Sequence, residues 1–123
     1  MTLVDASVWI GHLRRADPWL LRLLGAGAVL GHAFVLGEVA CGNLANRAET
    51  MRLMRDLPQA RVAEPDEALV FVERHGLFGI GIGYVDAHLL AAAALTPPAR
   101  LWTGDRRLAA AAHRLGLAME PDA

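Results

Sequence analysis

The stretch Thr2-Leu3-Val4-Asp5 joins a short apolar, β-capable segment to an acid. A short apolar run of this kind is typical of a strand buried on both faces of a parallel sheet. An acid directly behind it is unusual, because carboxylates are seldom buried unless they are paired or bound to a metal ion. The opening residues therefore predict a buried strand that carries Asp5 to a functional edge of the sheet.

Three further acids also stand where an apolar segment meets a turn or a helix. Asp105 closes Leu101-Trp102-Thr103-Gly104, Glu38 lies inside the apolar stretch from Ala33 to Cys41, and Asp86 opens a predicted helix. In parallel sheets, sites form beyond the carboxyl ends of the strands, so Asp5 and Asp105 are expected on one edge, with Glu38 and Asp86 presented beside them. Each acid also has a structural alternative, namely the cap of the turn Asp5-Ala6-Ser7 for Asp5, a helix N-cap for Asp86 and Asp105, and an exposed helix position for Glu38.

Strands and helices are expected to alternate along the whole chain. Besides the opening strand, the pattern predicts strands at 28–30, 61–63, 100–103 and 117–119, and helices at 17–24, 34–47, 49–57, 65–75, 86–95 and 106–115. This order predicts one α/β domain over residues 1–123, with three layers and a central, mainly parallel sheet of four to five short strands flanked by helices. The glycine-rich segment 76–83 is expected to be a loop leading into the next helix; a phosphate cradle is the weaker alternative, because the segment follows a helix.

The composition limits the classes of function. All 12 basic residues are arginine, and without a lysine a P-loop nucleotide enzyme is excluded. The net charge of −1 is unusual for a protein that binds nucleic acid, but without the four acids above the arginines outnumber the acids by three. No apolar stretch is long enough to span a membrane, and the first residues lack the basic segment of a secretory signal. The single cysteine, Cys41, is expected to be buried and fits a cytoplasmic protein.

Four carboxylates at one place predict a divalent cation. Two carboxylates about 4 Å apart repel each other by about 4 kcal/mol at an effective dielectric constant near 20. Mg²⁺ or Mn²⁺ removes this repulsion, prefers oxygen ligands, and activates a bound water for attack on a phosphodiester. A reaction of this kind needs no 2′-hydroxyl and leaves 5′-phosphate and 3′-hydroxyl ends. His88 is expected to point away from Asp86, and the three tryptophans are expected in the core.

The four acidic segments together resemble those of PIN-domain proteins, and more narrowly those of VapC-type ribonuclease toxins. The segments are Asp5-Ala6-Ser7-Val8-Trp9-Ile10, Glu38-Val39-Ala40-Cys41-Gly42, residues 81–91 with Asp86, and Leu101-Trp102-Thr103-Gly104-Asp105. The resemblance implies a Mg²⁺- or Mn²⁺-dependent endoribonuclease in which Asp5, Glu38, Asp86 and Asp105 hold the metal and activate water. Ser7 and Thr103 match hydroxyl positions that support the carboxylates. It also implies an RNA substrate, a homodimer and a small antitoxin protein, for which the segment Trp19 to Leu24 is the expected contact.

Two other classes of function compete with this one. The first is a catalytically inactive PIN-like module that binds RNA or protein, and the presence of all four acids argues against it. The second is a phosphoacceptor signalling domain, which relies on adjacent acids after the first strand and on a late lysine; this sequence has neither.

Within the acidic group, Gly104 is expected to leave Asp105 on a flexible turn, with the loosest hold on the metal.

Overall fold

A short parallel sheet forms the centre of the molecule. The computed structural model describes residues 1–121, and in these the sheet has three strands, β1 (Thr2–Val4), β2 (Val29–Leu30) and β3 (Arg100–Trp102), in the order β2-β1-β3. Leu3 pairs with Leu30 on one side and with Leu101 on the other, both in parallel register. The central strand is the opening apolar segment of the chain, and all three of its residues are buried.

The predicted parallel α/β class is confirmed, but the number of strands was overestimated. In residues 1–121, the segments predicted as strands at 61–63 and 117–119 form none, and the chain at or beside each makes one isolated bridge to the sheet region, Gly31 with Gln59 and Leu101 with Ala118. After the first bridge the N–H of Arg61 donates to the Thr96 hydroxyl at 3.0 Å, and the chain leaves the sheet at this point. An apolar, β-capable pattern marks segments that reach an edge but does not say how many backbone hydrogen bonds they form there.

Seven helices surround the sheet in the part of the chain that the structure describes. They are α1 (Ala6–Arg14), α2 (Pro18–Gly25), α3 (Ala33–Ala40), α4 (Arg47–Asp56), α5 (Pro65–His75), α6 (Tyr84–Leu95) and α7 (Arg106–Arg114). The sequence pattern did not predict α1, for which Asp5 is the N-cap. The long helix predicted over 34–47 is wrong beyond residue 40, because the chain turns at Cys41 and Gly42 before α4 begins. Cys41 is exposed at that turn, contrary to the expectation of burial.

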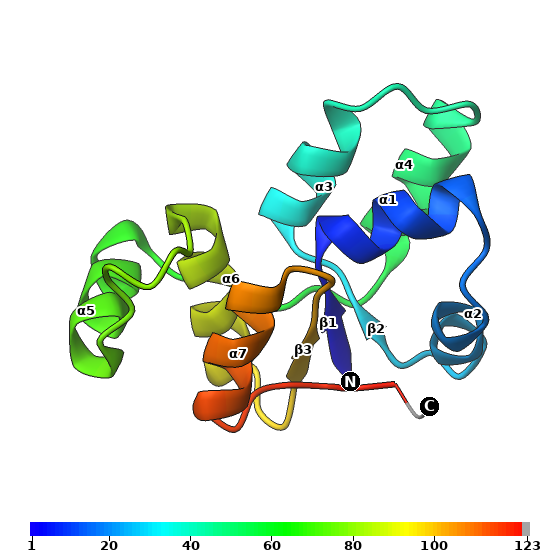
Figure 1. Cartoon of the computed structure of the whole chain (residues 1–123). Coiled ribbons are helices and arrows are strands. Elements are labelled where there is room, and N and C mark those ends of the chain that lie inside the picture. The colour runs from blue at the N-terminus through cyan, green and yellow to red at the C-terminus, as the bar shows by residue number, and fades with distance from the viewer. Residues whose placement is uncertain (122–123) are drawn as a thin grey trace.

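The helices form a layer on each side of the sheet. Figure 1 shows α1 to α4 on the side of β2, and α5 to α7 on the side of β3. Within these layers α1 contacts α3, α5 contacts α6, and both α6 and α7 contact β3. As expected, Trp9 and Trp102 are buried, and Trp19 packs against the core. None of the helices described is long and apolar enough to cross a membrane.

This arrangement brings distant segments to one edge of the sheet. β1 and β3 run side by side in the same direction, so α1 and α7 start next to each other at the carboxyl ends of the strands. Figure 1 shows the loop between β3 and α7 reaching the start of α1 at this edge, with α3 and α6 on either side.

Candidate active site

Asp5 is buried at the carboxyl end of β1 and is held by three hydrogen bonds. Its Oδ1 accepts the N–H of Ala6 at 2.8 Å, which caps α1. Its Oδ2 accepts the hydroxyl of Ser7 at 2.8 Å and that of Thr103 at 2.7 Å. The two hydroxyls expected to support the carboxylates thus both contact the predicted central acid, one from each side of the β1–β3 pair.

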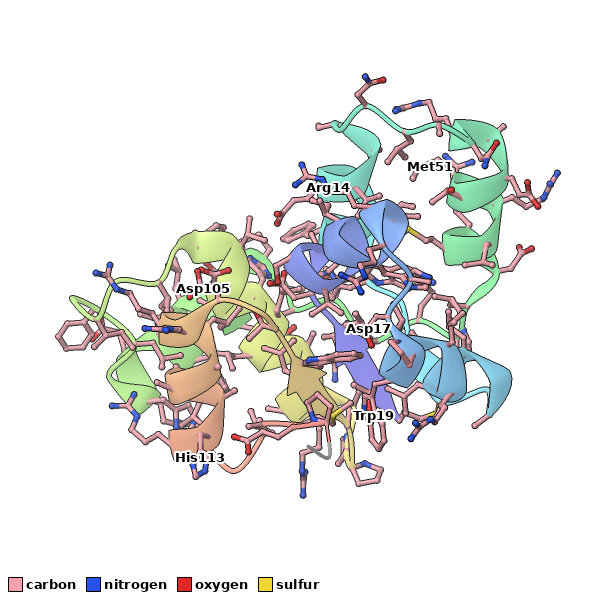
Figure 2. The ribbon with its side chains drawn as sticks, turned by 45° about the vertical axis from the view of Figure 1, so that its right-hand side comes forward. Arg14, Asp17, Trp19, Met51, Asp105 and His113 are labelled. Atoms are coloured by element: carbon pink, nitrogen blue, oxygen red, sulfur yellow. The ribbon has the colours of Figure 1, made fainter. Side chains whose placement is uncertain are left out.

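Asp105 starts α7 at the same edge, where Figure 2 labels it. Its Oδ1 accepts the N–H groups of Arg107 and Leu108, at 2.9 and 3.0 Å. The preceding residues fix the backbone, because the N–H of Gly104 donates to Ser7 Oγ and the N–H of Asp105 donates to Thr103 Oγ1, both at 3.0 Å. The two hydroxyls that hold Asp5 thus also hold this turn, and the expectation that Asp105 has the loosest hold on the metal stays a prediction.

Asp86 lies in the first turn of α6 and is half-buried. It does not open the helix as the sequence predicted, since α6 begins two residues earlier at Tyr84. Its Oδ2 instead accepts the N–H of Gly83, the residue before the helix, at 3.0 Å. This contact was not predicted, although an acid three residues after the N-cap has the spacing of a capping box.

Glu38 lies in α3, where it is exposed, and its carboxylate accepts no hydrogen bond from the described residues. Its side chain nevertheless belongs to the same electrostatic environment. Partial burial of the carboxyl group raises its pKa, and the charges of Asp5 and Asp86 raise it further.

The four acids influence one another across four different elements. The pKa of Asp86 is also raised, first by burial and then by the charges of Asp5 and Asp105, while the Gly83 N–H acts in the opposite direction. Asp5, Glu38, Asp86 and Asp105 are thus linked by mutual repulsion, directly or through one intermediate acid. The structural alternatives also hold in part, because Asp5 and Asp105 are helix N-caps as well as members of this cluster.

In the part of the chain that the structure describes, no basic side chain forms an ion pair with the four acids. Among residues 1–121 the one ion pair is between Arg61 and Glu67, at 3.5 Å, away from these acids. In the same residues no three histidine, cysteine or acidic side chains are close enough to hold one ion as they stand. These two findings are compatible with Mg²⁺, which keeps several waters and is commonly bound through only one or two carboxylates. The donor set, all oxygen and carrying negative charge without a counter-ion, suits such a cation.

His88 is buried and turns away from the acids, as expected, into an aromatic cluster. Its ring packs edge-on against Phe34 and Tyr84, with centroids 4.8 and 4.6 Å away, and Phe34 contacts His32 in the same manner. The approach of His32 to His88 was not predicted, because the two residues belong to segments far apart in the chain.

Two full-length relatives identify the family. Over 119 residues the chain is 46% identical to the protein called Ribonuclease VapC32 in two strains of Mycobacterium tuberculosis, CDC 1551 / Oshkosh and H37Rv, covering 97% of this chain and 96% of each relative. The chain belongs to the VapC family of ribonucleases. No family model matches it.

A solved structure supports the fold of this VapC-family chain. The crystal structure of PAE2754 from Pyrobaculum aerophilum aligns with a TM-score of 0.59 over 89% of this chain and 78% of that protein, at 20% sequence identity. At this identity the likeness shows the fold alone. The resemblance stated from the four acidic segments is confirmed by these comparisons, as is the PIN-like α/β fold, with three strands in place of four to five.

Proposed function

We propose that this VapC-family chain is a metal-dependent endoribonuclease that acts in the cytoplasm as the toxin of a toxin–antitoxin pair. The relatives called ribonucleases support the RNA substrate. The observation that carries the mechanism is the group of four acids without a basic partner in the described residues, in which the charges of Asp5, Asp86 and Asp105 contribute to the raised pKa of Glu38 or of Asp86. A protein that only bound RNA would gain nothing from such repulsion, because RNA is itself an anion.

Asp5 and Asp86 are the proposed direct ligands of Mg²⁺ or Mn²⁺, with Glu38 and Asp105 holding a second ion or orienting the attacking water. When bound, the cation lowers the pKa of water and stabilises the negative charge that develops on the phosphate. The acids keep oxygens available for this role: Oδ1 of Asp86 and Oδ2 of Asp105 accept no hydrogen bond from residues 1–121.

The protein groups around the ligands have separate tasks. Ser7 and Thr103 donate to the same oxygen of Asp5 and fix the direction of its carboxylate. Where Glu38 orients the attacking water and does not hold a second ion, it also accepts the proton of that water, which its raised pKa favours. Attack on phosphorus forms the new P–O bond of a 5′-phosphate and breaks the bond to the 3′ oxygen, which takes a proton from solvent water and leaves as a 3′-hydroxyl.

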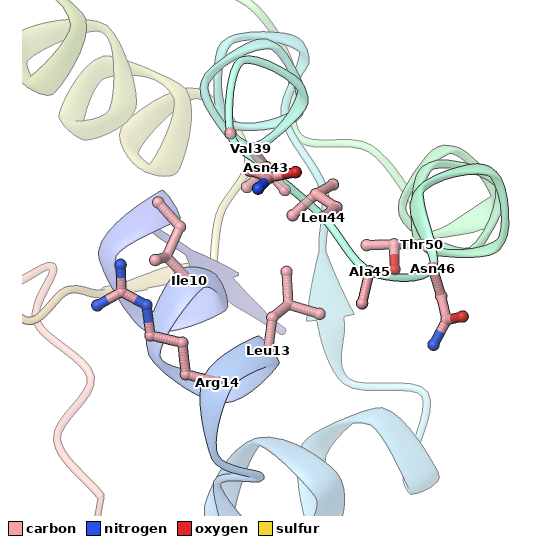
Figure 3. Close-up of a pocket in the computed structure, with 10 residues that line it drawn as sticks. Ile10, Leu13, Arg14, Val39, Asn43, Leu44, Ala45, Asn46 and Thr50 are labelled. Carbon is pink, nitrogen blue, oxygen red and sulfur yellow. The ribbon is translucent and has the colours of Figure 1, made fainter.

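The proposed partners are a second copy of the chain and a small antitoxin protein that covers the acidic edge and presents an arginine to it. The segment Trp19 to Leu24, expected to meet the antitoxin, gives most of its apolar side chains to the core: Leu20 is fully buried, and of the leucines only Leu21 is largely exposed. We place this contact instead in the groove of about 360 Å³ between α1 and the start of α4. Figure 3 shows Ile10 and Leu13 of α1 facing Leu44 across it, with Arg14 at the rim.

The test is cleavage of total bacterial RNA by the purified protein, with Mn²⁺ or with EDTA. We expect fragments with Mn²⁺, none with EDTA, and a loss on the order of 10³-fold in the Asp86→Asn variant, which removes one ligand charge without changing side-chain size. The melting temperature of Asp86→Asn in the absence of metal should equal or exceed that of the wild type, because repulsion is relieved. Binding without any metal-dependent cleavage by the wild type would instead favour the inactive module.

A further inference from the structure

Arg107, in the first turn of α7, packs its side chain onto the glycine-rich loop before α6. A Cβ atom on Gly81 would lie only 2.6 Å from both Cδ and Nη1 of Arg107, and 3.0 Å from its Nε. Gly81 also has a φ of +84°, which side chains rarely adopt. Glycine at position 81 therefore allows the guanidinium to lie directly on the loop backbone.

This contact connects two of the four acids. The N–H of Arg107 donates to Asp105 Oδ1 at 2.9 Å, and Gly83, two residues after Gly81, donates to Asp86 Oδ2 at 3.0 Å. The guanidinium thus rests at the border of the acidic site, on the loop that holds Asp86.

The Arg107 guanidinium has no partner among residues 1–121. It is exposed, it forms no ion pair, and no hydrogen bond from its side chain is present in that part of the chain. An arginine offers five N–H donors in a planar fork that matches the oxygens of a phosphate. Here the fork lies against the Gly81 backbone, and its donors remain free in the described residues.

We propose that Arg107 binds a backbone phosphate of the RNA strand that lies across the acidic site. This inference rests on the proposed ribonuclease function and assigns one residue to substrate binding. An RNA phosphate is favoured over an acidic protein partner because Arg107 adjoins two of the acids assigned to the cleavage reaction.

Arg106 is a matched control on the same helix. It is also exposed, but it lines a different depression together with His113, Arg114 and Glu120. Replacing either arginine by alanine removes one charge from the same turn of α7, so a difference between the two variants reports position and not net charge.

The first measurement is the affinity for fluorescein-labelled bulk transfer RNA, with Asp86→Asn as the common background so that the RNA stays uncut. We expect Arg107→Ala to weaken binding about tenfold and to reduce the slope of log affinity against log salt by about 1. Arg106→Ala should change the affinity less than about twofold. Arg107→Lys should fall between the wild type and Arg107→Ala, since lysine keeps the charge and loses the fork.

The second measurement uses Gly81→Ala, whose added methyl group displaces the guanidinium. It should weaken RNA binding about as much as Arg107→Ala does, and the double variant should bind no more weakly than either single one. Gly81→Ala in the Arg107→Ala background measures any effect of backbone strain alone, and melting temperatures show which variants are folded.

Equal affinities of Arg107→Ala and Arg106→Ala would overturn the assignment, as would the absence of any measurable RNA binding. Failure of the ribonuclease proposal is seen separately, as absence of Mn²⁺-dependent cleavage by the wild type. A loss confined to binding of an acidic protein partner would also contradict the proposal.

Discussion

The acidic edge and the histidine pair His32–His88 both bring titratable side chains together, but solvent reaches only the first. His32 and His88 are each 1% exposed, whereas Asp86 is half-buried and Glu38 is exposed. In both regions the fold favours the neutral form. Burial lowers the pKa of each histidine and contributes most to the raised pKa of Glu38 and of Asp86.

The difference in solvent exposure decides what can stabilise the side chains of each region. The histidine rings pack against Phe34 and Tyr84, and they remain neutral as part of the core. The acids are open on one side and lack a basic partner in the described residues, so a cation from solution can neutralise them. The two buried histidines therefore contribute to the packing of the core, and the acids at the open edge are the groups that the proposed reaction uses.

The largest expected effect is the dependence of stability on pH that His32 causes. Its Nδ1 accepts the N–H of Phe34 at 3.0 Å and caps α3, and its pKa is lowered to about 4 by burial and by the charge of His88. In the unfolded chain the pKa is about 6.5. Between these two pKa values the unfolded state binds more protons than the folded state. The contribution of neutral His32 to the free energy of unfolding is therefore complete above pH 6.5, and it falls by up to about 3 kcal/mol as the pH drops towards 4. Chemical denaturation measured over this range checks it.

His32→Asn separates the titration from the cap. Asparagine is a favoured N-cap and does not titrate, so the variant should lose overall stability but show a shallower dependence on pH below 6.5. The exposed His113→Asn variant should follow the wild type. A slope that is unchanged in His32→Asn would mean that His32 is not kept neutral by the fold.

Much of the acidic edge could be predicted from sequence, because strand order alone places the residues after β1 and β3 at one end of a parallel sheet. The family resemblance added Ser7 and Thr103. Prediction missed α1, because Asp5 was assigned to a metal and its local role as the helix N-cap was not recognised. It failed for 61–63 because a tertiary contact decides the structure there, where the Thr96 hydroxyl accepts the N–H of Arg61. The aromatic contacts between His32 and His88 depend on how α3 packs beside α6, which no local pattern records.

A smaller effect is expected from Thr103→Val, which removes a hydroxyl without changing the shape of the side chain. Asp5 Oδ2 then loses one of its two hydroxyl donors, and the N–H of Asp105 loses its acceptor. RNA cleavage in Mn²⁺ should fall about 10- to 100-fold, the usual effect of losing a group that orients a metal ligand. Initial rates on a fixed RNA substrate, compared at several Mn²⁺ concentrations, measure the loss.

Thr96→Val is the matched control for that loss. The Thr96 hydroxyl also makes two hydrogen bonds, donating to the Ala92 carbonyl at 2.8 Å and accepting from Arg61, but it lies at the opposite end of α6 from Asp86. Both variants should lose about 1 kcal/mol of stability per hydrogen bond. Equal loss of activity in the two would show that the effect of Thr103 is one of stability only.

The smallest expected effect is the stabilisation of the folded protein by Mn²⁺. At ten times its dissociation constant, an ion that binds only the folded state adds about 1.4 kcal/mol, or roughly 4 °C in melting temperature. The raised pKa values of Glu38 and Asp86 set the direction with pH: as the pH falls, these carboxylates gain protons sooner than ordinary ones, and protons compete with the ion. The shift should therefore be larger at pH 7.5 than at pH 5, and absent in a Glu38→Gln/Asp86→Asn double variant, whose metal-free melting temperature should already be raised. KCl at the same ionic strength is the control. If it gave the same shift, the acids would be responding to screening and not to a bound ion.

The acidic edge would then bind no cation, and solvent exposure would be its one difference from the histidine pair.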